Sequence, residues 1–154
     1  MSSRIFFAGL FLFMVILVPA LARAGINSVV KNNDLQFGSF VSLGSSGTVT
    51  VGANGARSAG GGVRIMTGGT VTAASFTAIG SNHSKYTVVL PANNTVFISH
   101  GGYTLALTNF SCSVPLTGNL SGKTPMTFTV GATATVVPGP VPGSYSGTFN
   151  VTVQ

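Results

Sequence analysis

Short runs in which apolar and polar residues alternate constrain the fold of this chain more than any other feature. The clearest run is Gly143 to Gln154, where positions 149, 151 and 153 are apolar and positions 148, 150 and 152 are Thr or Asn. A period of two is that of a β-strand with one buried and one solvated face. Because no residue of this run is charged, the strand either pairs inside a sheet or offers an edge to another chain. The candidate assembly edge therefore consists of Tyr145, Phe149, Val151 and Val153.

Similar runs recur along the chain and predict further strands. They are expected at Asp34–Val41, Thr48–Val51, Val63–Met66, Thr70–Ile79, Tyr86–Leu90, Val96–Ser99, Tyr103–Thr108 and Met126–Val130. A short first segment, Gly25–Asn33, is either a strand or a flexible arm.

Four of these strands carry a specific expectation. In the first long one, Gly38 marks a bulge or a close backbone approach, and Val41 faces inward. A change of apolar phase near Ala73 predicts a second bulge. Tyr103 is expected to face inward, and Tyr86–Leu90 is apolar on both faces, as in a central strand.

Glycine and asparagine mark the turns between the strands. Asn54-Gly55 and Gly101-Gly102 predict two hairpins, because both residue types tolerate the left-handed backbone that tight turns need. Gly44–Gly47 is expected to be a turn, Ala59–Gly62 a loop, and Pro138–Gly143 the turn before the last strand.

The fold class follows from the spacing of these signals. Eight to ten short strands are expected, with turn residues every 8 to 12 positions and no helical period outside the first 24 residues. This pattern predicts an antiparallel β-sandwich with immunoglobulin-like character. No repeat of fixed period is present, so a solenoid or a propeller is not supported.

The first 24 residues have the pattern of an export leader. Arg4 precedes an almost wholly apolar run, Ile5–Val18, and Ala22-Arg23-Ala24 places small residues at a signal-peptidase site. Cleavage after Ala24 leaves one domain, Gly25–Gln154, in the periplasm, on the cell surface or outside the cell. An uncleaved membrane anchor is the alternative, but Pro19 and the A-x-A pattern favour removal.

Charge is scarce in the expected mature chain. Five basic residues and one acidic residue remain, which leaves a net charge of about +4. The basic residues are scattered singly, whereas a nucleic-acid footprint needs them clustered, so nucleic acid is rejected as a partner. A charge-poor surface is typical of a subunit that packs against neighbours.

The side chains that could carry chemistry are too few for an enzyme. Asp34 is the only acidic residue, so a pair of catalytic carboxylates is impossible, and its expected role is to bond local backbone at a turn. His83 and His100 sit in loop-like contexts without a third ligand, which argues against a metal site. Ala59–Gly62 lacks the Lys-Ser/Thr of a phosphate cradle. No cofactor or small-molecule substrate is expected.

Cys112 is the only cysteine, so an intramolecular disulfide cannot form. Between Phe110 and Val114 it is expected to be a small apolar filler, and an intermolecular bridge or a reactive thiol is the alternative.

Several short motifs, taken in order, resemble a known family. They are D-L-x-F-G at Asp34–Gly38, G-A-R-S at Gly55–Ser58, G-G-T-V at Gly68–Val71, a central Y-T-V-x-L-P, and the terminal G-x-Y-S-G-T-F-x-V-T-V. In this order the chain resembles the bacterial secreted family catalogued as domain of unknown function 4402. That family is similar to spore-coat-U-like and chaperone–usher pilin subunits, and the resemblance implies an export-assembled surface structure.

Two functions remain open from the sequence. The first is a non-enzymatic structural or adhesive subunit of a surface fibre or coat, which meets like subunits and a periplasmic chaperone through edge strands. Ile26 and Val30 then belong to a candidate donated strand, although its apolar alternation is short. The alternative is a self-contained secreted sandwich that binds glycans through loops near Asn93-Asn94 and His100; the chain has no Trp for a glycan platform.

Overall fold

The structure is a computed structural model that describes residues 25–122, 124–139 and 145–154. Within these ranges the chain is all-β, with twelve strands and no helix. The expected leader and most of the Pro138–Gly143 turn lie outside the described residues. The strands are β1 (Ile26–Asn33), β2 (Gln36–Phe37), β3 (Phe40–Val51), β4 (Arg57–Ile65), β5 (Val71–Thr72), β6 (Ala74–Gly80), β7 (Lys85–Val89), β8 (Val96–His100), β9 (Tyr103–Cys112), β10 (Thr117–Asn119), β11 (Met126–Val136) and β12 (Thr152–Val153).

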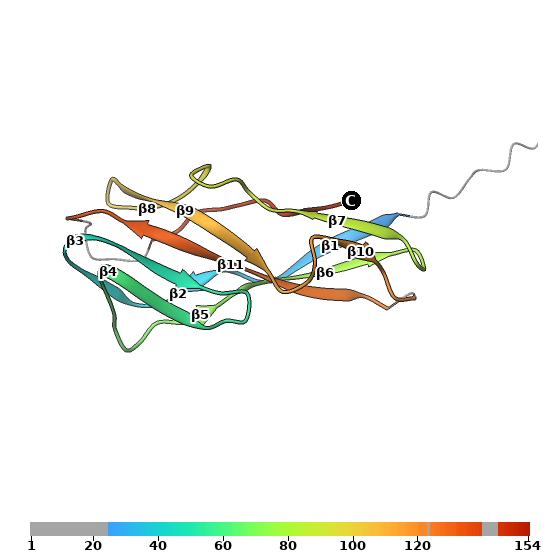
Figure 1. The fold of residues 1–154 in the computed structure, drawn as a ribbon, viewed down its shortest axis with the longest axis horizontal. Coiled ribbons are helices and arrows are strands. Elements are labelled where there is room, and N and C mark those ends of the chain that lie inside the picture. The colour runs from blue at the N-terminus through green and yellow to red at the C-terminus, as the bar shows by residue number, and fades with distance from the viewer. Residues whose placement is uncertain (1–24, 123, 140–144) are drawn as a thin grey trace, which may run out of the picture.

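β11 is the spine of the largest sheet (Figure 1). On one edge it pairs first with β6, along Met126–Val130, and then with β3, along Ala132–Val136. Its other edge pairs with β9, which also pairs with β8. β1 extends the sheet beyond β6, and β4 extends it beyond β3. All of these pairings are antiparallel, as the sequence pattern predicts.

Two smaller sheets complete a sandwich-like fold. One has the order β10-β7-β12, and the other is the pair β2-β5. Side chains of β7 pack on side chains of β6, which places the three-stranded sheet against one end of the large sheet. At the other end the large sheet curls, because residues of β3 and β4 share a buried cluster with residues of β8 and β9.

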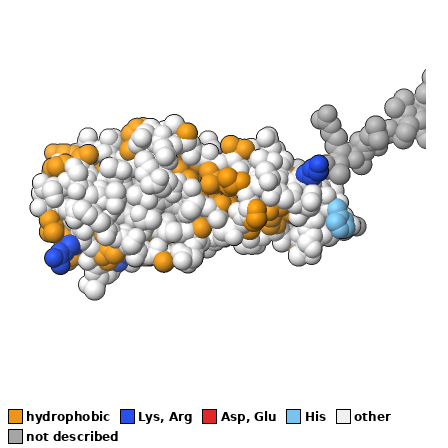
Figure 2. All heavy atoms as spheres, in the orientation of Figure 1, with side chains coloured by type: hydrophobic (Ala, Val, Ile, Leu, Met, Phe, Trp, Pro, Cys, Tyr) orange, Lys and Arg blue, Asp and Glu red, His pale blue; other side chains and the backbone are white. Residues whose placement is uncertain are grey.

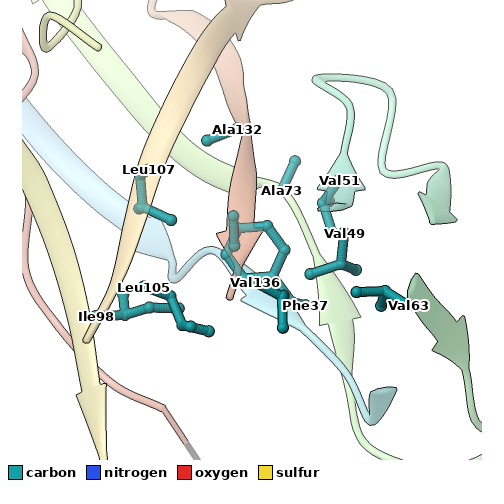
Figure 3. Close-up of a cluster of buried hydrophobic side chains, with 11 residues drawn as sticks. Phe37, Val49, Val51, Val63, Ala73, Ile98, Leu105, Leu107, Ala132 and Val136 are labelled. Atoms are coloured by element: carbon teal, nitrogen blue, oxygen red, sulfur yellow. The ribbon is translucent and has the colours of Figure 1, made fainter. Parts of the chain in front are cut away.

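The core therefore consists of two clusters arranged along the molecule. The first contains Phe37, Val49, Val51, Val63, Ala73, Ile98, Leu105, Leu107, Ala132, Ala134 and Val136. Figure 3 shows Ile98, Leu105 and Leu107 on one side of it and Val49 and Val63 on the other, with Phe37 between them. The second contains Ala74, Phe76, Ala78, Tyr86, Val88, Leu120, Phe128, Val130 and Val153.

β11 connects the two clusters. Its even-numbered residues point inward: Phe128 and Val130 lie in the second cluster, and Ala132, Ala134 and Val136 in the first. The Phe128 ring stacks on Phe76 at a centroid distance of 5.4 Å and is 1% exposed. Full burial of such a side chain contributes about 1.5–3 kcal/mol, so this strand is a main source of stability.

The glycine-rich segments expected to be a turn and a loop are strands instead. Gly44–Gly47 lies within β3 and Ala59–Gly62 within β4, and the two strands pair with a register shift between Ser42 and Gly47. A Cβ built on Gly62 would lie only 2.2 Å from the Ser45 carbonyl oxygen. Glycine is present here because a bulged strand approaches its neighbour's backbone, and not because the chain turns.

Gly38 also has a larger effect than a bulge. Its φ of 65° separates the two-residue β2 from β3, and this break changes the phase of the following residues. Phe40 consequently packs against the first cluster, whereas Val41 is 40% exposed. The prediction that Val41 faces inward is therefore wrong.

Other local expectations have mixed outcomes. The hairpin across Gly101-Gly102 is confirmed, but Tyr103 is 40% exposed because it is paired with His100 next to the turn, at the tip of that hairpin. The Asn54-Gly55 hairpin is confirmed as a longer turn from Gly52 to Ala56.

Two further strand predictions need correction. The change of phase at Ala73 is real, but its cause is a change of sheet: β5 pairs with β2, and β6 pairs with β1 and β11. β7 is central in its sheet, yet Val89 is 46% exposed, because this small sheet is covered on one face only.

Candidate functional site

Among the described residues, the C-terminal segment, residues 145–154, has strand pairing only near its two ends. Ser146 forms an isolated antiparallel bridge with Ser99 of β8, with N···O distances of 2.9 and 3.2 Å. β12 then pairs with β7, and Gln154 exchanges two hydrogen bonds with Thr87. Residues 147–151 belong to no strand. The continuous terminal strand predicted from the sequence is thus largely wrong, because alternation fixes side-chain facing but supplies no neighbouring backbone.

The facing of the side chains does follow the predicted alternation. Val153 is buried, and Phe149 and Val151 are partly buried against the second cluster. Thr148, Asn150 and Thr152 are exposed. Tyr145 packs against the first cluster, and its ring lies 5.6 Å from the His100 ring.

A groove of about 820 Å³ runs between this segment and the start of the sandwich. One wall is the unbroken stretch Asp34–Ser42, and the other wall is formed by Tyr145, Ser146, Gly147 and Phe149. Ile98 and Leu107, which are buried members of the first cluster, also line it. Core side chains therefore border this space.

The first wall is fixed from behind by Arg57. Its guanidinium donates hydrogen bonds to the carbonyl oxygens of Phe37, Ser39 and Met66 at 3.0, 3.1 and 3.1 Å. A Cβ on Gly38 would lie 2.3 Å from Arg57 Nη1, so the guanidinium can pack this closely against residue 38 only because that residue is glycine. The planar guanidinium group can reach three fixed acceptors at once, and a lysine ammonium cannot do so in the same geometry.

Along this wall the strands are paired on one edge. β2 pairs with β5, and Phe40–Ser42 of β3 pairs with β4. The ladder between β11 and β3 ends at Val136 and Gly47, so no described strand lies on the second edge of Phe40–Ser42. Among the described residues, Ser42 Oγ is also a buried side-chain oxygen without a hydrogen-bond partner. Hydrogen bonding on this wall is therefore incomplete.

The candidate donated strand lies elsewhere, on the chain's own sheet. β1 pairs with β6 from Ile26 to Asn33 and forms an outer strand there. Ile26 is partly buried against the second cluster, whereas Val30 is 52% exposed. A donor role would require β1 to leave β6.

Asp34, His83 and Cys112 have different surroundings in the described part of the chain. Asp34 pairs with Lys31 at 2.6 Å, on side chains that are 64% and 60% exposed, instead of bonding the local backbone as predicted. His83 is exposed, and Cys112 is a free, partly buried thiol against the second cluster. In the part of the chain that the structure describes, no three His, Cys, Asp or Glu residues are close enough to hold a metal ion.

The loop residues named for glycan binding are engaged locally. Asn93 Oδ1 accepts a hydrogen bond from the Asn109 backbone N–H at 2.8 Å, and the backbone of Asn94 has a φ of 61°. The Asn93 side chain thus connects this loop to β9.

Charged groups are sparse on the surface. On the face drawn in Figure 2, the Lys and Arg side chains lie near the two ends, and the long middle part carries none. Within residues 25–122, 124–139 and 145–154, no helix has the length and hydrophobicity that crossing a bilayer takes.

The groove residues Phe40, Ile98 and Leu107 are missing from the sequence-based site. Ile98 and Leu107 show the alternation of buried strand residues, and that pattern does not reveal that they border a groove. The groove depends on two walls that are about a hundred positions apart in the sequence. Nothing local to either wall indicates the other.

Comparison with known proteins gives one finding. No curated protein matches the chain, and no solved structure matches it. The family model described as "Domain of unknown function (DUF4402)" matches residues 28–154, which is nearly all of the expected mature domain. The chain therefore belongs to the DUF4402 family.

Proposed function

We propose that the chain is a non-enzymatic, exported structural subunit of a cell-surface fibre or coat, and that it associates with like subunits through strand edges. The observation that carries this proposal is the C-terminal segment, where residues 147–151 lie outside any strand beside the groove. Unpaired backbone at a sheet border is a template for another strand.

Two further features support the proposal. The leader pattern of residues 1–24 is that of a protein sent out of the cytoplasm. The surface has few charges, and charged side chains are the groups that interfaces tend to exclude from their centres.

A charge placed on the exposed side of the C-terminal segment tests the role of this edge. Asn150→Lys adds an ammonium group at an exposed position without removing a core contact, and edge lysines oppose strand addition. Thr104→Lys, at an exposed position of β9, is the matched control. The full chain is expressed with its leader, recovered from the exported fraction and weighed by intact mass spectrometry.

Light scattering of that material and electron microscopy of the cell surface then give the outcome. The proposal predicts a mature chain that begins at Gly25, oligomers or surface assemblies for the wild type and for Thr104→Lys, and their loss in Asn150→Lys. A monomer at high concentration with a bare cell surface would contradict it, as would assemblies that Asn150→Lys leaves intact.

A further inference from the structure

We infer that a pocket at the point where the chain passes from β5 to β6 binds one neutral sugar unit. We name it the junction pocket, and its lining is Asn33, Ala53, Asn54, Gly55, Val71, Thr72, Ala73, Ser75 and Thr129. It is separate from the groove, because no residue lines both. Sugar binding there is an activity beyond the proposed assembly and does not depend on it.

The junction pocket forms because two strands share one edge of β11. β6 pairs with this edge as far as Val130, and β3 takes it over from Ala132. A Cβ on Gly131, between them, would lie 2.2 Å from the Val51 carbonyl oxygen, so β3 approaches this closely only because residue 131 is glycine. The pocket lies where the two strands meet, next to the turn from Gly52 to Ala56.

The pocket has a buried floor and an exposed rim. Ala73 and Ser75 are only 9% and 8% exposed, whereas Asn33 and Asn54 are exposed. Its volume of about 340 Å³ is at the lower end of the range for ligand pockets. This size suits a single ring, and it does not suit a chain of several units.

Two threonine hydroxyls of the lining are fixed as hydrogen-bond acceptors. Thr72 Oγ1 donates its proton to the Asp34 carbonyl oxygen at 2.8 Å. Thr129 Oγ1 donates its proton to the Ala53 carbonyl oxygen at 2.6 Å. A hydroxyl has one proton and two lone pairs, so each oxygen keeps only its capacity to accept. Both hydroxyls can therefore accept a hydrogen bond from a ligand O–H.

The two rim asparagines supply the donors. Asn54 Oδ1 accepts a hydrogen bond from the Ala56 N–H at 3.0 Å, which leaves the two Nδ2 protons for a ligand. Among the described residues, nothing forms a hydrogen bond with the Asn33 side chain, so its amide can both donate and accept. Fixed acceptors beside amide donors match the hydroxyls of a sugar, each of which donates one bond and accepts others.

The lining also determines the charge of the ligand. It contains no charged side chain, and the neighbouring Asp34 carboxylate is already paired with Lys31. A charged ligand would lose solvation without gaining an ionic partner, and an apolar ligand would cover the amides and hydroxyls without bonding them. The lining has no aromatic residue, so hydrogen bonds must supply the affinity. A few such bonds correspond to a Kd of about 1 mM.

An NMR titration of the isotopically labelled, purified protein tests this inference. The probes are methyl glucoside, methyl galactoside and methyl mannoside, and the control is methyl glucuronide, which has the glucoside ring with a carboxylate. At least one neutral glycoside is expected to shift the amides of Gly55 and Thr72 with a Kd of about 1 mM. The glucuronide is expected to bind at least about tenfold more weakly. The amide of Asn94, in a loop outside the pocket, should not shift.

Two pairs of variants locate the binding site. Asn33→Ala removes a rim amide, and Asn27→Ala removes an exposed amide of the same strand outside the pocket. Thr72→Val removes an acceptor, and Thr95→Val removes a hydroxyl that also donates to a backbone carbonyl oxygen but lies outside the pocket. Asn33→Ala and Thr72→Val are each expected to weaken binding about 3- to 10-fold, and both controls should bind within about twofold of the wild type.

The other outcomes overturn the inference. Absence of binding by all three neutral glycosides would do so, as would equal binding of the glucuronide or shifts confined to residues outside the junction pocket. Unchanged binding in either Asn33→Ala or Thr72→Val would show that the ligand is held elsewhere. Assembly is not measured in this titration, so its failure leaves the proposed function standing. Assemblies that Asn150→Lys leaves intact would, in turn, leave sugar binding standing.

Discussion

Gly147→Ala tests how the C-terminal wall of the groove is held in place. A Cβ on this residue would lie 2.4 Å from the Phe97 carbonyl oxygen and 3.1 Å from Ile98 Cα. Ordinary carbon contacts are about 3.5 Å, so the segment would have to move about 1 Å away from β8.

The cost follows from the hydrogen bonds that this movement breaks. Ser146 and Ser99 exchange two bonds of 2.9 and 3.2 Å, and an extra 1 Å takes both beyond hydrogen-bonding range. At about 0.5–1.5 kcal/mol each, their loss lowers the free energy of unfolding by about 1–3 kcal/mol. The usual cost of overpacking a tight site has the same range.

Urea denaturation of the purified protein measures this loss. Gly60→Ala is the matched control, because its Cβ would meet only Thr48 Oγ1, at 3.6 Å, and the expected change is within about 0.5 kcal/mol. Equal stabilities of wild type and Gly147→Ala would refute the reasoning, since the C-terminal segment could not then be seated against β8.

Three further substitutions test other parts of the structure. Phe128→Ala removes a ring that is 1% exposed and is expected to lower the free energy of unfolding, measured in urea, by about 3–5 kcal/mol. Phe97→Ala, whose side chain is 51% exposed, is the control and should cost less than about 1 kcal/mol. Similar costs would contradict the two-cluster core. Arg57→Lys leaves the carbonyl oxygens of Phe37, Ser39 and Met66 without their shared donor and is expected to lower the free energy of unfolding by about 1–3 kcal/mol. Arg64→Lys, exposed on the same strand, is the control and should leave stability unchanged. Two unchanged stabilities would show that Arg57 does not support the wall. Cys112→Ser should leave the migration of the chain on a non-reducing gel unchanged, and a dimer band that disappears in this variant would show that the thiol joins two chains.

The sequence is a good guide to the features that depend on neighbours along the chain. The inward facing of Phe149, Val151 and Val153 is predictable because alternation is a local property of an extended backbone. The hairpin at Gly101-Gly102 is predictable for the same reason.

The failures are cases in which a distant strand decides the structure. Ala59–Gly62 has the composition of a loop, but it is a strand because a bulge in β3 approaches it closely. Val41 is exposed because Gly38 shifts the phase of the chain, and Arg57, a residue of another strand, packs against that glycine. The groove itself requires Asp34–Ser42 and the C-terminal segment to lie opposite each other, although they are far apart in the sequence. No local pattern in either segment contains that information.

Amide hydrogen exchange of the purified protein tests most directly whether the sandwich is open along this groove. The amides of residues 147–151 are expected to exchange rapidly, close to the rate of an unprotected chain, while those of β9 and β11 stay protected. Protection of residues 147–151 as strong as that of β11 would mean that their backbone is already paired in the free protein, and would contradict the account.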